Sequence, residues 1–271
     1  MEENNQVNQE LMDDEEFELS HTDKLVGVFT EPKETFSKIS KFPPKVVDWF
    51  LPLFLMIVVA VLSNVVMMSN PTIKYKIIDE QMTKMEERFD EMVESGDLTR
   101  EQADAQLERT REFMEGGGAF GLITQAIGTV IFVFVFFFLI SFVFHLLAKM
   151  VFKGEGSYSH SMVAYGLPMY ISVIQIVLMV LAAMTMDKLF TDLSVASFAG
   201  MDKHTLLGFI LSKVDVFSIW FYGVFAIGLA KMHKSNDTGK FMGLVYGTWI
   251  GFSLILFALS KAFPFFSNFI R

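Results

Sequence analysis

The sequence predicts an all-α, polytopic membrane protein with five transmembrane helices and a helical hairpin outside the membrane between the first and second helix. Three observations predict this fold class. The 271 residues are 52% hydrophobic and 14% aromatic, which is more apolar than a soluble domain of this length requires. Five segments are apolar over the roughly 20 residues that a helix needs to cross a bilayer. None of these five segments contains an Asp, Glu, Lys or Arg.

The chain begins with an acidic segment. Residues 1–23 hold nine acidic residues and no Lys or Arg, so we expect a disordered tail in water. The segment lacks the basic-then-apolar pattern of a cleavable signal peptide. The first apolar segment is therefore expected to serve as both targeting signal and membrane anchor.

Residues 24–46 are predicted to form an amphipathic helix on the membrane surface. Phe29, Phe36, Ile39 and Phe42 recur at roughly helical spacing. An alternative interpretation is a plain positive flank that sets the orientation of the first span. The interleaved lysines, which are expected near anionic lipid headgroups, are Lys33, Lys38, Lys41 and Lys45.

The first span is predicted over residues 49–68, and a polar insert follows over residues 70–118. An apolar residue recurs every three to five positions in the first half of the insert, Gly96 breaks the pattern, and Thr99 with Gln102 forms a capping box for a second helix. These signals predict two helices that pair as a short coiled coil outside the membrane. The hairpin is either a self-contained solvated unit or a surface for a partner or a second copy.

The remaining spans are predicted over residues 119–148, 162–186, 216–230 and 241–259, with a short tail over residues 264–271. Lys213 and Asp215 interrupt an apolar run that begins at Leu206. We interpret this pair as a helix break at the membrane boundary, preceded by a short interfacial helix over residues 203–212. A functional intramembrane pair is the alternative.

The distribution of lysine predicts a cytoplasmic N-terminus and a C-terminus outside. With this orientation the short inner flanks hold nine lysines, whereas the short outer segments hold five basic residues. Basic residues are enriched on the cytoplasmic side of membrane proteins, and the first span usually dominates.

Two groups of residues in the spans are candidate sites. Asn64, Gln125 and Gln175 are uncharged polar residues that either form hydrogen bonds between helices or line a site for a polar ligand. The second group lies four residues apart on one face of the last span. Its members, which either pack against another helix of the chain or form a homodimer face, are Gly243, Gly247 and Gly251.

The residues give no basis for an enzyme. The five histidines do not fall in a metal-binding spacing, and no phosphate-binding glycine loop or nucleophile motif is present. The absence of cysteine excludes disulfides and thiol chemistry. We therefore expect no catalytic residue, no metal and no cofactor, and the acidic net charge of −9 argues against a nucleic-acid partner.

Four stretches carry a family resemblance. They are FTEPKETFSKI at 29–39, DWFLP at 48–52, GEGSYSHSMVAYGLP at 154–168 and VFSIWFYGVFAIGLAKMHKS at 216–235. In this order they resemble the Yip-one (Ypt-interacting-protein) domain family, particularly its prokaryotic members. Leu51 stands where the family commonly has glycine. The matched motif positions, which we expect to be structural, are Asp48, Pro52, Tyr165, Gly166 and Pro168.

The resemblance implies five transmembrane helices, a cytosolic N-terminus and a C-terminus on the other side, here in a prokaryotic cytoplasmic membrane. Eukaryotic relatives bind prenylated Rab-type GTPases and act in vesicle traffic. The insert at 70–118 is absent from the eukaryotic pattern. Only the topology and the motif positions are therefore carried over.

These observations together predict a non-enzymatic scaffold, adaptor or membrane-organising protein embedded in the lipid bilayer. It is expected to form a homo-oligomer or to bind a protein partner through the acidic tail or the hairpin. The alternative is a small transporter or permease subunit for a neutral solute that binds near Asn64, Gln125 and Gln175. Coupled transporters place ionisable groups near the middle of the bilayer, and the five apolar segments lack them.

Overall fold

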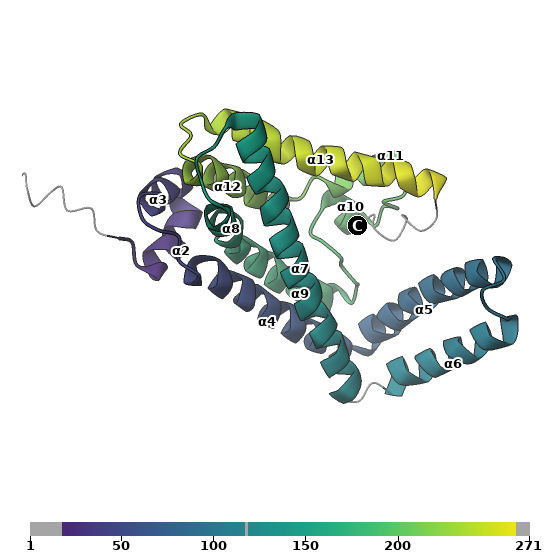
Figure 1. Cartoon of the computed structure of the whole chain (residues 1–271). Coiled ribbons are helices and arrows are strands. Elements are labelled where there is room, and N and C mark those ends of the chain that lie inside the picture. Colours follow the sequence, from purple (N-terminus) through teal and green to yellow (C-terminus); the bar gives the residue numbers. More distant parts are fainter. Residues whose placement is uncertain (1–17, 117–118, 264–271) are drawn as a thin grey trace, which may run out of the picture.

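In a computed structural model of the chain, residues 18–116 and 119–263 are described, and all regular secondary structure in these two ranges is helical (Figure 1). The helices follow one another along the chain as α2 (His21–Thr30), α3 (Pro32–Ile39), α4 (Val47–Ser69), α5 (Pro71–Glu94), α6 (Arg100–Gly116), α7 (Ala119–Phe152), α8 (Tyr158–Gly166), α9 (Met169–Met186), α10 (Val195–Ala199), α11 (Leu206–Ser212), α12 (Val216–Met232) and α13 (Thr238–Ala262).

Four helical segments of the described chain are individually long and apolar enough to cross a bilayer, and a bent pair makes a fifth candidate when its two helices are counted as one span. The four are Val47–Ser69, Ala126–Phe152, Tyr158–Met186 and Thr238–Ala262. The pair consists of α11 and α12, which meet at an angle of 57°. The predicted all-α, five-span fold class is confirmed, and so is the helix break at Lys213 and Asp215.

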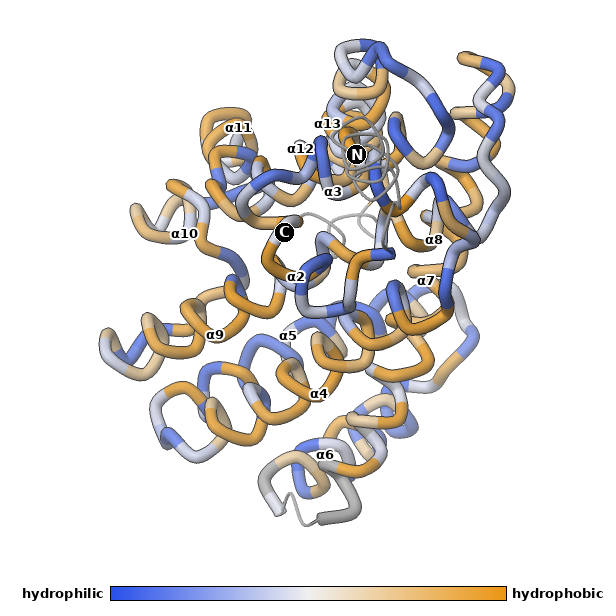
Figure 2. Tube along the Cα trace, turned by 90° about the vertical axis from the view of Figure 1, so that its left-hand side faces the viewer, coloured by the Kyte–Doolittle hydropathy of each residue, from blue (hydrophilic) through white to orange (hydrophobic). Residues whose placement is uncertain are grey.

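The surface of the spans is apolar as well as the interior. On α7, Phe137 and Phe144 are buried, whereas Ile131, Val135 and Leu139 are more than half exposed. Hydrophobic residues occur along most of α4 in the same way (Figure 2). A helix that is apolar on all sides is stable when lipid covers the faces that protein does not cover.

The N-terminal segment forms two helices rather than the single surface helix predicted over residues 24–46. α2 begins at His21 after a capping box between Ser20 and Asp23. The predicted disordered tail over residues 1–23 is therefore wrong for residues 18–23, which lead into and begin α2. Residues 1–17 and the predicted tail at 264–271 lie outside the described residues.

The apolar side of α3 is covered by protein. Phe36 and Ile39 are 0% and 4% exposed, and α3 packs against α12. Gly228 permits this contact, because a Cβ atom at that position would lie 2.8 Å from Cζ of Phe36. The prediction that this face lies on the membrane is therefore wrong for Phe36 and Ile39, since packing against α12 covers both side chains.

The insert between the first two spans is the predicted helical hairpin, formed by α5 and α6. Its second helix begins as expected, because N–H of Thr99 donates to Oε1 of Gln102 at 3.0 Å and N–H of Gln102 donates to Oγ1 of Thr99 at 3.2 Å. Gly96 makes the turn with a φ of 82°. The hairpin lies at the opposite end of the molecule from α2 and α3 (Figure 1).

Candidate functional site

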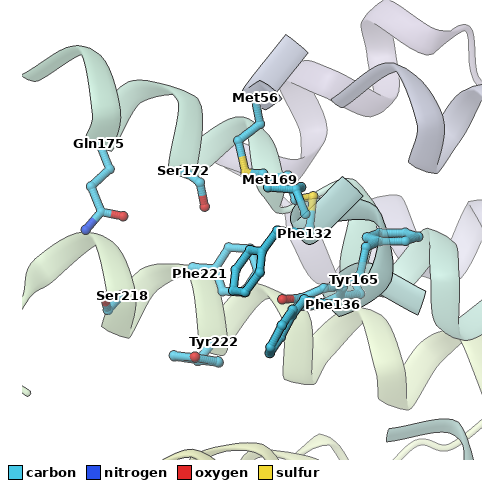
Figure 3. Close-up of a pocket in the computed structure, with 12 residues that line it drawn as sticks. Met56, Phe132, Phe136, Tyr165, Met169, Ser172, Gln175, Ser218, Phe221 and Tyr222 are labelled. Atoms are coloured by element: carbon cyan, nitrogen blue, oxygen red, sulfur yellow. The ribbon is translucent and has the colours of Figure 1, made fainter. Parts of the chain in front are cut away.

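A cavity of about 320 Å³ lies among the spans, between α4, α7, α9 and α12 (Figure 3). It is open beside Phe132 and Phe136 of α7, which are 59% and 41% exposed within a candidate span. The lining is mostly aromatic and methionine side chains with three polar residues, namely Met56, Phe132, Val133, Phe136, Phe137, Tyr165, Met169, Ser172, Gln175, Ser218, Phe221 and Tyr222.

Gln175 of α9 is held at the floor of this cavity by Asp215. Nε2 of Gln175 donates to Oδ2 of Asp215 at 2.6 Å, and Oγ of Ser218 donates to the same oxygen at 2.6 Å. The other carboxylate oxygen of Asp215 accepts from N–H of Phe217 at 3.1 Å and caps α12. Asp215 is 2% exposed, so it forms the buried centre of a polar cluster, and its position at the membrane boundary stays a prediction.

The structure does not bring Asn64, another of the predicted polar residues, to this cavity. Asn64 is absent from the lining, and its Oδ1 atom is buried without a hydrogen-bond partner among the described residues. The side chain of Gln125 lies outside the described part of the chain. The predicted interhelical hydrogen bond is therefore present for Gln175 and absent for Oδ1 of Asn64.

A second polar cluster joins α2 to the spans. Nζ of Lys24 lies 2.7 Å from Oδ2 of Asp48, and Nδ1 of His21 lies 3.2 Å from Oδ1 of Asp48. Nε2 of His21 lies 2.7 Å from the hydroxyl oxygen of Tyr170 on α9. Asp48 is one of the predicted motif positions, but its partners were not predicted, although His21 and Lys24 are spaced to share one helix face.

Two histidines meet near one serine of α8. Oγ of Ser161 lies 2.8 Å from Nε2 of His233 and 3.3 Å from Nδ1 of His145. His233 follows α12 and is 2% exposed. Burial, followed by the nearby His145, lowers the pKa of His233 to about 4. His145 is also buried.

The glycine face of α13 does not pack within the chain as expected. A Cβ atom built at Gly243, Gly247 or Gly251 has no described neighbour within 4 Å outside its own helix. α13 instead uses another face against α12, where Phe241 and Val245 are buried. The prediction of packing within the chain is wrong, because larger side chains on the other face of the helix make the contact. The homodimer face remains a prediction.

The matched motif positions include close contacts near the start of α4. A Cβ atom at Gly166 would lie 2.6 Å from Cα of Trp49, so glycine is needed where α8 crosses α4. Pro168 separates α8 from α9, and Pro52 is buried inside α4. The ring of Tyr165 packs 5.0 Å from that of Phe225, measured between centroids. These contacts support the structural roles, which stay a prediction.

The four lysines of the N-terminal segment are exposed, two on α3 and two in the loop that leads to α4. Lys38 pairs with Glu34 at 2.8 Å, and Lys45 pairs with Glu18 at 2.7 Å. Lys33 and Lys41 are also exposed. A role on the membrane surface stays a prediction for all four.

No cluster within residues 18–116 and 119–263 offers three His, Cys, Asp or Glu side chains that could hold a metal ion. The polar clusters found in this part of the chain combine amides, hydroxyls, imidazoles and single carboxylates. They can hold helices together or accept hydrogen bonds from a ligand.

Comparison with known proteins agrees with this architecture. The sequence matches the family described as Yip1 domain over residues 26–260. No curated protein and no solved structure gives a match. Since the family match extends across all five spans and the hairpin, the protein belongs to the Yip1 domain family of membrane proteins.

Proposed function

We propose that the protein is a non-enzymatic membrane scaffold that recruits a partner with a basic surface through the hairpin of α5 and α6. The observation that carries this proposal is an acidic groove on the hairpin. The groove has a volume of about 440 Å³. Its floor is apolar, and its rim is formed mainly by carboxylates. The lining residues are Met82, Asp104, Leu107, Glu108, Arg111 and Glu112.

The charge of the hairpin supports a basic partner. Residues 73–115 hold thirteen acidic and seven basic residues, and Asp104, Glu108 and Glu112 are exposed. A negative surface attracts a positive one and raises the rate of association. The apolar floor adds the buried contact that a charged rim alone does not supply.

The base of the hairpin is attached to the membrane domain. Ile73 is fully buried and packs with Ala183 and Phe190. At the same junction, Nδ2 of Asn70 donates to Oδ1 of Asp187 at 2.8 Å. These contacts support a hairpin that is held at a defined angle, which suits a platform for a partner.

Site-specific photo-crosslinking in native membranes tests the proposal. A photoreactive residue in place of Ala105, which is exposed on α6 beside the groove, should capture one major protein. The same residue at Val151 on α7 serves as the control. Combined Glu108→Lys and Glu112→Lys substitutions should abolish the adduct.

A second pair of substitutions controls for the change of charge. Glu86→Lys with Glu87→Lys alters the charge of the hairpin by the same amount outside the groove and should preserve the adduct. An adduct at Ala105 that persists after the substitutions at Glu108 and Glu112 contradicts the proposal.

A second candidate function is transport of a small solute. The observation that favours it is the break between α11 and α12 at Lys213 to Asp215, beside a mostly apolar cavity with three polar residues, since interrupted helices commonly carry the binding sites of transporters. Solute flux into proteoliposomes that is abolished by Gln175→Leu supports this candidate. Flux that persists in the variant contradicts it.

A further inference from the structure

The cavity between α7 and α12 has an electron-rich floor. Because Nε2 of Gln175 donates to Asp215, the amide oxygen of Gln175 is directed the other way, toward Ser172 and the cavity (Figure 3). Oγ of Ser218 uses its proton for Asp215, so it offers only lone pairs to a ligand. The floor therefore presents hydrogen-bond acceptors.

A negative charge lies directly beneath these acceptors. Both oxygens of Asp215 accept hydrogen bonds, as expected of an ionised carboxylate. No Lys, Arg or His of the described chain forms an ion pair with it. The N-terminus of α12 stabilises the charge without neutralising it. The cavity is thus biased toward a cation.

The walls suit the same kind of ligand. The rings of Phe132, Phe136 and Phe221 gather on one side of the cavity, and Tyr222 adds another ring near Ser218 (Figure 3). The faces of aromatic rings attract ammonium groups, most strongly where water is excluded. A volume of about 320 Å³ lies within the range of small-molecule sites.

We infer that this cavity is a binding site for a hydrophobic ammonium ion, that is, an apolar body that carries a protonated amine. Such a ligand partitions into the membrane and reaches the cavity through the mouth beside Phe132 and Phe136. Its N–H groups donate to Gln175 and Ser218, and its charge is compensated by Asp215. The site is separate from the hairpin groove and does not depend on the scaffold function.

Three probes of nearly equal shape test the inference with the full-length protein in nanodiscs. They are 4-phenylbutylamine, 4-phenylbutanol and 4-phenylbutanoate, and binding is measured by calorimetry against empty nanodiscs. The amine should bind about tenfold or more tightly than the alcohol, since hydrogen bonds to a charged group are stronger than those between neutral groups. The carboxylate should bind most weakly. Equal binding of amine and alcohol, tighter binding of the carboxylate, or no saturable binding of the amine overturns the inference.

Asp215→Asn identifies the source of the selectivity. Asn caps helices as well as Asp does, so the variant removes the charge and retains the cap of α12. The amine should lose about tenfold in affinity while the alcohol is unchanged. Asp237→Asn is the matched control, because Asp237 caps α13 in the same way and its hydrogen bonds are to Ser235 and Lys240, which do not line the cavity. Retention of the preference for the amine in Asp215→Asn contradicts the inference. If that variant does not fold, the order of the three probes on the unsubstituted protein decides.

Discussion

Nζ of Lys24 lies 2.7 Å from Oδ2 of Asp48, and the two side chains are only 4% and 1% exposed. This ion pair joins α2 to the first turn of α4, and His21 extends it to Tyr170 of α9. The N-terminal helices are therefore part of the membrane domain and not an appendage to it. Removing only one partner of such a buried pair strongly destabilises the folded protein, because the other charge is left buried without compensation.

Lys24→Met should lower the free energy of unfolding by about 3–5 kcal/mol, because it leaves the carboxylate of Asp48 buried without its main partner. The thermal midpoint in detergent measures the effect. Lys38→Met is the matched control, since Lys38 forms an exposed pair with Glu34 and exposed pairs contribute about 1 kcal/mol or less. Equal effects of the two substitutions would show that the buried pair is unimportant.

Gly166→Ala should destabilise the contact between α8 and α4. The new Cβ atom would lie 2.6 Å from Cα of Trp49, and a backbone atom cannot move away without separating the helices. We expect a loss of about 1–3 kcal/mol, which the thermal midpoint reports. Gly247→Ala is the control, because open space surrounds that position in the described structure. The prediction is contradicted if Gly247→Ala lowers the thermal midpoint and Gly166→Ala does not.

Gly247→Leu tests whether the glycine face of α13 is open or joins two copies of the chain. Since this face is open, the substitution should leave the thermal midpoint of the monomer unchanged. If the face joins two copies of the chain, the fraction of dimer measured by light scattering in detergent should fall. An unchanged dimer fraction, or a sample that is monomeric before the substitution, removes the homodimer prediction.

Stability should fall between pH 7.5 and pH 5 because of His233. Its pKa is lowered to about 4 in the folded protein, by burial first and then by His145, with His160 and Lys149 adding to the effect. The unfolded chain binds the proton near pH 6.5, so the contribution is complete above that pH and is lost as the pH falls toward 4. The loss at pH 5 should be about 2 kcal/mol.

The thermal midpoint at the two pH values measures this loss. His233→Gln should flatten the dependence, because glutamine can still bond to Ser161 and does not titrate. His204→Gln, at an exposed position, should leave the dependence unchanged. A wild-type protein with the same midpoint at both pH values contradicts the assignment.

The orientation is tested by reporter fusions. Alkaline phosphatase after Arg271 should be active, whereas a fusion after Lys153 should be inactive, since the lysine-rich flanks are expected in the cytoplasm. Activity at Lys153 and none at Arg271 would reverse the orientation and place the hairpin in the cytoplasm.

The spans, the hairpin and the break before α12 could all be predicted from the order of residues, because each depends on a local signal. Lipid requires about 20 consecutive apolar residues, a capping box lies within four residues, and a glycine at positive φ ends a helix where it stands. Each signal can be read without knowing what the segment packs against.

Which side chains meet, in contrast, depends on the assembled helices. Lys24 and Asp48 are 24 residues apart, and Gln175 and Asp215 are 40 residues apart, so neither pair has a local pattern. The open glycine face of α13 and the burial of Phe36 were equally hidden from sequence reasoning. In a membrane protein, lipid and protein cover apolar surfaces about equally well, so hydrophobicity alone does not say which face of a helix turns inward. Shape and the pairing of polar groups make that choice, and both arise only when the helices come together.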